Sequence, residues 1–397
     1  MTYVLPVHLE RPPMLRAAAG WIWITLLAAA PWAYACLDDW AKIGLGAAGV
    51  LATLLWLAHH IRMALVAGGT RRSLWWNGRW ACIAAVAAIL LLGWWMAGNA
   101  HSVYVAAQRH LTPVASILPA SPGAADRFTA AETMWPLTGI LGLLLVAADL
   151  GREPRWRERF AGCVSLTAAS IAAYGILEKL HLLPHLTVQP GFPTSAFGPF
   201  DYHGNAAAFL NLAIPAGFYL AFSRSAQLSP KSYILRIIGS ASLLLCVVGE
   251  GFNISRAGVM IGGVEVAVLV GWAVAAYRPR ALGRRFAWLG AAVLAIVLAA
   301  GVGVTLFLHP GHRGSLVEDY LQRPLWHSGR FLAWRVAWGM SADAPWFGSG
   351  AGSFKLLFPL SPHWIPELYS RWIITWHTPG TRVSGWSYAC EDYLQTL

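Results

Sequence analysis

Charged residues are scarce in this chain, since Asp, Glu, Lys and Arg together make up only 12% of its 397 residues. An ordinary soluble domain carries about 25% charged residues, so the composition argues against a soluble globular protein. Hydrophobic residues reach 57% instead. We therefore expect an all-α polytopic membrane protein.

Cysteine pairs and repeats are lacking as well. The five cysteines show no CxxC spacing and fall mostly within or beside apolar segments, which is typical of small apolar fillers. We find no internal repeat, low-complexity tract or separate soluble domain. These absences disfavour a cysteine-based framework and a repeat architecture.

Nine apolar segments can cross about 30 Å of hydrocarbon as helices. They are Ala17–Cys36, Ile43–Ala58, Trp80–Gly98, Trp135–Ala148, Phe160–Leu177, Asn205–Phe222, Tyr233–Val248, Ala257–Tyr277 and Phe286–Leu308. We expect a transmembrane domain over residues 1–308 and, over 309–397, a tail with short helices that is rich in Trp, His and Arg. The two long outer loops, Asn99–Met134 and His181–Gly204, are rich in proline, which disfavours long helices and favours short amphipathic pieces.

Basic residues gather in every second connecting loop, from Arg62, Arg71 and Arg72 onward to Arg284 and Arg285. By the positive-inside rule this predicts a cytoplasmic N-terminus, an odd number of crossings and an outer tail. The net charge of +11 is thus mostly a topology signal, and its spread over short turns argues against nucleic-acid binding. A cleaved signal peptide remains the alternative for the first span and would leave this orientation unchanged.

Two arginines are candidates for anion binding. Arg256 follows Ser255 at the outer mouth of the eighth span, where a charge is costly unless it faces protein or a bound anion. A helix N-terminus and a guanidinium converge on phosphate, and interfacial snorkelling is the alternative. Arg330 opens a predicted helix, Arg330–Met340, that carries Trp334. Packing on tryptophan or contact with lipid headgroups could also explain Arg330.

A third polar stretch enters the sixth span from outside. Tyr202, His203 and Asn205 lie together there, and we expect Asn205 and Asn211 to be buried near the start of the span. This cluster suggests a polar cleft that opens outward. Capping of a helix by Asn205 is the simpler explanation.

Together these stretches resemble the O-antigen ligase and O-antigen polymerase superfamily of membrane glycosyltransferases. The resemblance rests on the order and common sidedness of several short motifs, each of them weak alone. The motifs are Gly198 to Asn205, Ser255-Arg256-Ala257, Arg330…Trp334…Asp343-Ala-Pro345…Gly348-Ser-Gly350…Phe354, and Asp392-Tyr-Leu-Gln395. They cover the chain from about Phe197 to its end.

The resemblance implies a GT-C-like enzyme of a bacterial inner membrane with a periplasmic tail. Its donor would be a glycan on undecaprenyl pyrophosphate, and its acceptor a lipid, a protein or another glycan. Arg256 and Arg330 would hold the pyrophosphate without a metal or other cofactor, and a single displacement would invert the anomeric centre. Membrane lipid would be a further partner. The substrate-binding residues carried over or adjoining these motifs are Tyr202, His203, Asn205, Ser255, Trp334 and Asp392.

The chain departs from the family pattern at the general base and at its end. Cys390 and Glu391 stand where relatives commonly have a His-Asn pair, and a thiol with a pKa near 8.5 suits that role poorly. We favour His377 as the base, with Glu391, Asp392 and the more distant His363 as alternatives. Relatives also continue into further spans, so we expect this chain to be truncated before them.

Other functions stay open at this point. Asp38 and Asp39 could hold a divalent metal in a different sugar transferase, although an exposed acidic turn is the simpler and preferred explanation. Glu250 and Glu265 could serve a transporter or flippase of lipid-linked glycan. A structural partner of an envelope assembly is a third possibility, and the sequence does not separate a ligase from a polymerase.

Overall fold

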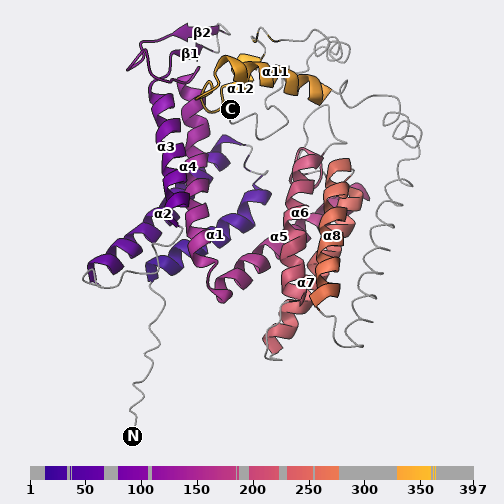
Figure 1. Cartoon of the computed structure of the whole chain (residues 1–397). Coiled ribbons are helices and arrows are strands. Elements are labelled where there is room, and N and C mark those ends of the chain that lie inside the picture. The colour runs from indigo at the N-terminus through magenta and orange to yellow at the C-terminus, as the bar shows by residue number, and fades with distance from the viewer. Residues whose placement is uncertain are drawn as a thin grey trace. The chain divides into compact units, whose positions relative to one another are not determined.

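The computed structural model describes residues 14–33, 36, 38–66, 79–105, 110–184, 186, 196–222, 230–253, 255–276, 329–358, 361 and 363. Helices dominate this part of the chain, and seven of them are long and apolar enough to cross a membrane (Figure 1). The chain is therefore a helical, multi-pass membrane protein.

Ten helices and one β-hairpin lie in the described residues. They are α1 Met14–Trp32, α2 Asp39–Val66, α3 Arg79–Gly98, β1 Ser102–Val105, β2 His110–Pro113, α4 Arg127–Leu150, α5 Pro154–Lys179, α6 His203–Phe222, α7 Pro230–Phe252, α8 Arg256–Ala276, α11 Gly329–Asp343 and α12 Phe354–Leu357. The first eight predicted spans fall on α1 to α8 in order, although the first runs past the end of α1 at Trp32. The seven helices long enough to cross are α1 to α7, and α8 contains a shorter apolar stretch, Ala257–Ala273. The ninth predicted span and the predicted boundary at Leu308 lie outside the described residues.

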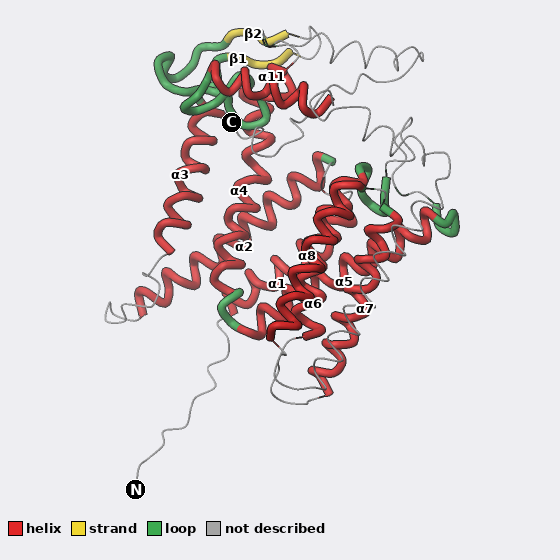
Figure 2. The backbone as a smooth tube through the Cα atoms, turned by 45° about the vertical axis from the view of Figure 1, so that its right-hand side comes forward, coloured by secondary structure: helices red, strands yellow, loops and turns green. Residues whose placement is uncertain are grey.

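One compact unit contains α1, the end of α4 from Val146, and α5 to α8. Here α6 packs against both α7 and α8, and α5 packs against α6 and α7 (Figure 2). Small residues bring the helices close, because a Cβ on Gly239 of α7 would lie 2.7 Å from the carbonyl oxygen of Gly217 on α6. Such glycine contacts allow close backbone packing between membrane helices.

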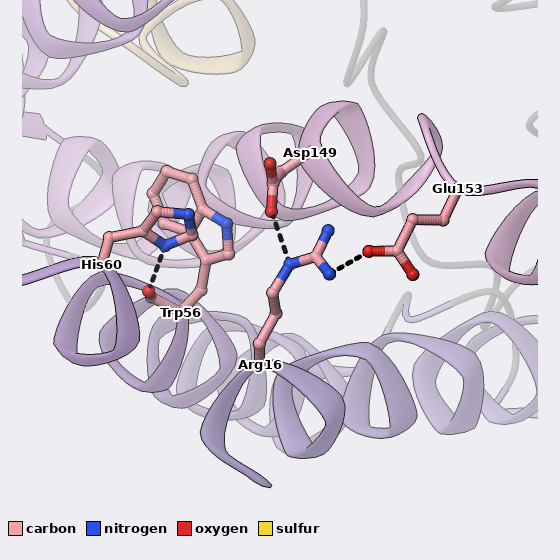
Figure 3. A network of polar contacts seen from close by, with 5 residues as sticks. All are labelled: Arg16, Trp56, His60, Asp149 and Glu153. Carbon is pink, nitrogen blue, oxygen red and sulfur yellow. Dashed lines mark hydrogen bonds and ion pairs between the residues drawn. The ribbon is translucent and has the colours of Figure 1, made fainter. Parts of the chain in front are cut away.

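Arg16 ties α1 to the α4–α5 turn of the same unit. Its Nε donates to Asp149 Oδ2 at 2.9 Å, and a second guanidinium nitrogen donates to Glu153 (Figure 3). The side chains of Arg16 and Asp149 are largely buried. Charge-assisted hydrogen bonds of this kind are stronger than neutral ones, so the network fixes the position of α1.

The second compact unit contains α2 from Lys42, α3, the hairpin, α4 up to Leu145, and the tail helices α11 and α12. A Cβ on Gly49 of α2 would lie 2.6 Å from the Cα of Gly139 on α4, so these two helices cross at glycines. The tail helices have a small core of their own, formed by Ala333, Val336, Ala337, Phe354 and Phe358.

The loop after α3 forms a β-hairpin, and the end of the predicted loop Asn99–Met134 is helical from Arg127, where α4 begins. Strands β1 and β2 pair antiparallel, from Ser102 opposite Pro113 to Val105 opposite His110. β-branched and aromatic residues favour the extended chain here. Asn99 then organises the rest of the loop: its fully buried amide donates to the carbonyls of Leu118, Ser121 and Pro122, and its oxygen accepts the Leu118 N–H.

Candidate functional site

The start of α8 is built by Ser255. The buried Ser255 hydroxyl accepts the N–H of Gly258 at 3.2 Å, and its carbonyl accepts the N–H of Val259 at 2.9 Å. This is the geometry of an N-cap, which satisfies a backbone donor that would otherwise lack a partner. Arg256 is therefore the first residue of the helix, as the sequence predicted. Its side chain lies outside the described residues.

The segment that leads into α6 is anchored on α5. The Phe197 ring is fully buried over Gly175, where a Cβ would collide with it. Gly198 has a φ of +59°, which L side chains rarely adopt, and its N–H donates to the buried Glu178 carboxylate at 2.6 Å. Phe197 and Phe200 close the turn by bonding to each other's backbone. The glycine of this motif thus has a clear conformational role.

Helix α6 begins at His203, and the Tyr202 carbonyl accepts the N–H groups of Asn205 and Ala206. The expectation that Asn205 is buried is wrong, since its side chain is exposed on the first turn, whereas Asn211 is buried as predicted. Capping by Asn205 is also excluded, because the helix starts before it. Tyr202 is exposed, and its ring centroid lies 4.5 Å from that of His203.

Asn253 joins the start of α6 to the turn before α8. Its side-chain nitrogen donates to the His203 carbonyl at 2.9 Å, and the residue is fully buried. One turn further along α8, Asn211 donates to the Gly258 carbonyl at 3.0 Å. The structure therefore brings His203 together with the Ser255 turn. Sequence reasoning missed Asn253, although it lies only two residues before Ser255.

The tail helix α11 spans Gly329–Asp343, so it contains the predicted helix Arg330–Met340 and ends before Pro345. Arg330 is its second residue, with a side chain outside the described residues. Trp334 and Trp338 pack together at a centroid distance of 5.9 Å and remain exposed. The buried face instead carries Ala333, Val336 and Ala337.

The glycine-rich loop after α11 packs on the segment before α4. Ala125 donates its N–H to the Ser349 carbonyl at 2.9 Å, and a Cβ on Gly350 would lie 2.5 Å from the Ala124 Cβ. Gly350 also has a φ of +93°, and Gly352 a φ of +71°. Only glycine combines a positive φ with a contact too close for a Cβ, so this part of the tail motif serves to pack the loop within its unit.

A histidine–carboxylate pair closes the end of α11. His363 Nε2 lies 3.0 Å from Asp343 Oδ2, and its ring packs over Gly339. Both side chains are substantially exposed, at 40% for His363 and 56% for Asp343. The favoured base His377, with Glu391 and Asp392, lies outside the described residues.

The described residues contain no group of three or more His, Cys, Asp or Glu side chains that could hold a metal ion. Asp38 accepts a hydrogen bond from the Trp40 indole at 3.2 Å on the surface. The described chain therefore gives the proposed Asp38–Asp39 metal site no additional acidic or histidine ligand.

Comparisons with family models, curated proteins and solved structures found no match to this chain. The resemblance to the O-antigen ligase superfamily therefore remains a hypothesis that rests on the quoted motifs.

Proposed function

We propose that this chain is a membrane glycosyltransferase that moves a glycan from undecaprenyl pyrophosphate to an acceptor hydroxyl, without a metal ion and with inversion. The observation that carries the proposal is the 2.9 Å hydrogen bond from Asn253 to the His203 carbonyl, which links positions 50 residues apart. It joins the segment before α6 to the turn that opens α8. Two motifs that the family resemblance assigns to one site are therefore local neighbours.

The two arginines support a role on the donor side. Arg256 and Arg330 both lie in the first turn of a helix, α8 and α11 respectively. Backbone N–H groups and the positive end of the helix dipole favour an anion at such a position, and a guanidinium adds bidentate hydrogen bonds to phosphate. These groups would stabilise the negative charge that grows on the departing pyrophosphate.

On the acceptor side, we favour His363 as the general base over His377. Asp343 can hold one ring nitrogen of His363 as a donor and leave the other free to take a proton, which is the logic of carboxylate–histidine pairs in hydrolases. The acceptor oxygen would attack the anomeric carbon while the bond to the pyrophosphate oxygen breaks. The hydroxyl proton would pass to His363, and undecaprenyl pyrophosphate would leave with the bonding electron pair.

The test is transfer from purified undecaprenyl-pyrophosphate glycan by the protein in proteoliposomes with chelator present. We expect Arg256→Ala and Arg330→Ala each to lower the rate by about 100-fold or more, the usual effect of losing one group that stabilises transition-state charge. Arg335→Ala is the matched control, because Arg335 is an exposed arginine on the same helix as Arg330. Full activity in both test variants, or loss of activity in chelator, would contradict the proposal.

The base is tested separately. We expect His363→Gln to lower kcat by about 100-fold or more and to remove the limb of the pH–rate profile that reports the base. His377→Ala and Glu391→Gln should then keep that limb. The opposite pattern would return the role to the predicted residues.

Supplying one acceptor at a time distinguishes a ligase from a polymerase. A polymerase makes a ladder of products from donor alone. A ligase adds its glycan only when a lipid or protein acceptor is present.

A further inference from the structure

The C-terminal end of α3 coincides with the edge of the hydrocarbon layer. Its apolar stretch, Ala81–Gly98, has 18 residues. At a rise of about 1.5 Å per residue it measures about 27 Å, nearly the thickness of the hydrocarbon core, so the whole stretch is needed to cross. Trp94 and Trp95 are exposed near this end, and tryptophans gather at the boundary between lipid and water. Gly98 therefore lies at that boundary.

The loop between β2 and α4 folds back onto this end of α3. Asn99 directly follows Gly98, and its side chain accepts the N–H of Leu118 at 2.8 Å and donates to the Leu118 carbonyl at 3.1 Å. One turn earlier in α3, the Trp95 indole donates to the Ser121 hydroxyl at 2.9 Å. These contacts hold the loop at the level of the last turn of α3, the end of the helix at which Figure 1 also shows the hairpin.

Two large apolar side chains of this loop are exposed. Ile117 is 63% and Leu118 52% exposed, and the surrounding segment, Val114–Gly123, has no charged residue. Exposed apolar surface of this kind is unfavourable in water. The exposed apolar surface of α3, which includes Leu91 and Leu92 within its membrane stretch, reaches the turn at which the loop is held. A loop in this position is therefore next to lipid.

We propose that Ile117 and Leu118 insert into the lipid bilayer at the boundary between headgroups and acyl chains, and so anchor this loop to the membrane surface. The headgroup layer on each side of the bilayer is about 5–8 Å thick, which a side chain at the level of the last turn of α3 can reach. Phe128, in the first turn of α4, is exposed beside the same end of α3. Its neighbour Arg127 donates to the Gly98 carbonyl at 3.4 Å, and an arginine at this depth keeps its charge among the headgroups.

A protein partner fits this surface less well than lipid does. A specific protein interface buries roughly 1,200 Å² or more, far beyond what two aliphatic side chains supply. Insertion into lipid requires no matching partner surface. The anchor would hold the loop between β2 and α4, and with it the hairpin, against the membrane. This surface does not depend on glycan transfer.

The test places the photo-crosslinking residue p-benzoylphenylalanine (Bpa) at single positions of the full chain, reconstituted in vesicles of phosphatidylethanolamine and phosphatidylglycerol. After irradiation, Ile117→Bpa and Leu118→Bpa should each form phospholipid adducts, detected as added mass on the peptide that contains the residue. Leu91→Bpa is the positive control, because Leu91 is exposed within the membrane stretch of α3. His110→Bpa is the matched loop control, because His110 is exposed and pairs with Val105 at the end of the hairpin farther from α3 along the strand. We expect at least tenfold more adduct at positions 117 and 118 than at position 110.

Equal adduct yields at positions 117, 118 and 110 would overturn the proposal. Absence of phospholipid adducts at 117 and 118, while Leu91→Bpa is labelled, would overturn it as well. Crosslinks to a second copy of the chain, seen as a covalent dimer, or to another protein in cell membranes would assign the surface to that partner instead. If Ile117→Bpa does not fold, Leu118→Bpa decides the outcome. Since the readout is contact with lipid, failure here leaves the transfer assay unaffected.

Discussion

Asp126 gives a test of the fold through both substitution and pH. The side chain is 1% exposed, and its two oxygens accept the N–H of Thr129 at 2.7 Å and the N–H of Tyr104 at 2.6 Å. It therefore caps α4 and holds the first strand of the hairpin with one carboxylate. Replacing it with alanine removes an N-cap worth about 1 kcal/mol and leaves a Tyr104 N–H unpaired at a cost of about 1–3 kcal/mol. We expect a loss of about 2–4 kcal/mol of local stability.

Hydrogen exchange at the Tyr104 amide measures this loss where it arises. A stability change of about 1.4 kcal/mol is tenfold in an equilibrium constant, so Asp126→Ala should speed exchange there by about 30-fold or more. Glu132→Gln is the control, because Glu132 is a more exposed carboxylate of the same unit that pairs with Lys42 at 3.4 Å. Surface pairs contribute little, so Glu132→Gln should leave Tyr104 exchange unchanged. Equal effects of the two substitutions would refute the role of Asp126.

The pH dependence of the same site has a defined sign. Burial alone would raise the pKa of Asp126, but hydrogen bonds from Thr129 and the Tyr104 amide, with the charge of Lys355, lower that pKa below its usual value. The stabilisation is therefore complete above the unfolded-state pKa of about 3.9 and is lost as pH falls through the lower folded-state pKa. The melting-temperature difference between the parent protein and Asp126→Asn should be largest at neutral pH and shrink below about pH 4. A constant difference from pH 7 to pH 3 would contradict this account.

Three further predictions follow from single contacts. Gly350→Ala should lower stability by about 1–3 kcal/mol in thermal melts, because a φ of +93° is strained for alanine and its Cβ would press on Ala124. Asp149→Ala should lower the free energy of unfolding by about 1–3 kcal/mol, because it leaves the largely buried Arg16 guanidinium with fewer acceptors. An unchanged melting temperature would count against the role of the Arg16 network in holding α1. Trp346→Cys, at a position 87% exposed, should react with an impermeant maleimide added on the side opposite the N-terminus if the tail lies on the predicted outer side.

The helices were predictable because each needs only a long apolar run, which is a local property of the sequence. The end of α11 was predictable for a similar reason, since Pro345 cannot continue a helix. The hairpin was not predictable from such patterns. Its loop depends on Asn99, which bonds three carbonyls 19 to 23 residues away along the chain. Contacts at that distance leave no periodic signal.

Only part of the local geometry around the candidate site was predictable. The sequence placed Ser255 and Arg256 at the start of a helix, because a serine before an apolar run is a common N-cap. It did not identify Asn253 or Glu178, since a single polar residue near the end of an apolar helix is ordinarily a surface residue. Their burial comes from loops that fold back onto the helix ends, so only the tertiary structure reveals them. Asn205 shows the converse, because it was expected to be buried and lies on the exposed side of α6.

Several motif positions have structural explanations that require no substrate. Gly198 and Gly350 adopt positive φ angles, and Ser255 caps α8. A protein with similar loops would share these residues whatever it binds. Their presence is therefore explained by local backbone geometry and gives little evidence of chemistry. The backbone sets no comparable demand for arginine at position 256 or 330, since any good helix former is accommodated in a first turn. Arg256→Ala and Arg330→Ala should therefore slow transfer by about 100-fold or more without lowering the melting temperature. Gly198→Ala should lower both together, and this contrast separates the proposed chemistry from the scaffold that presents it.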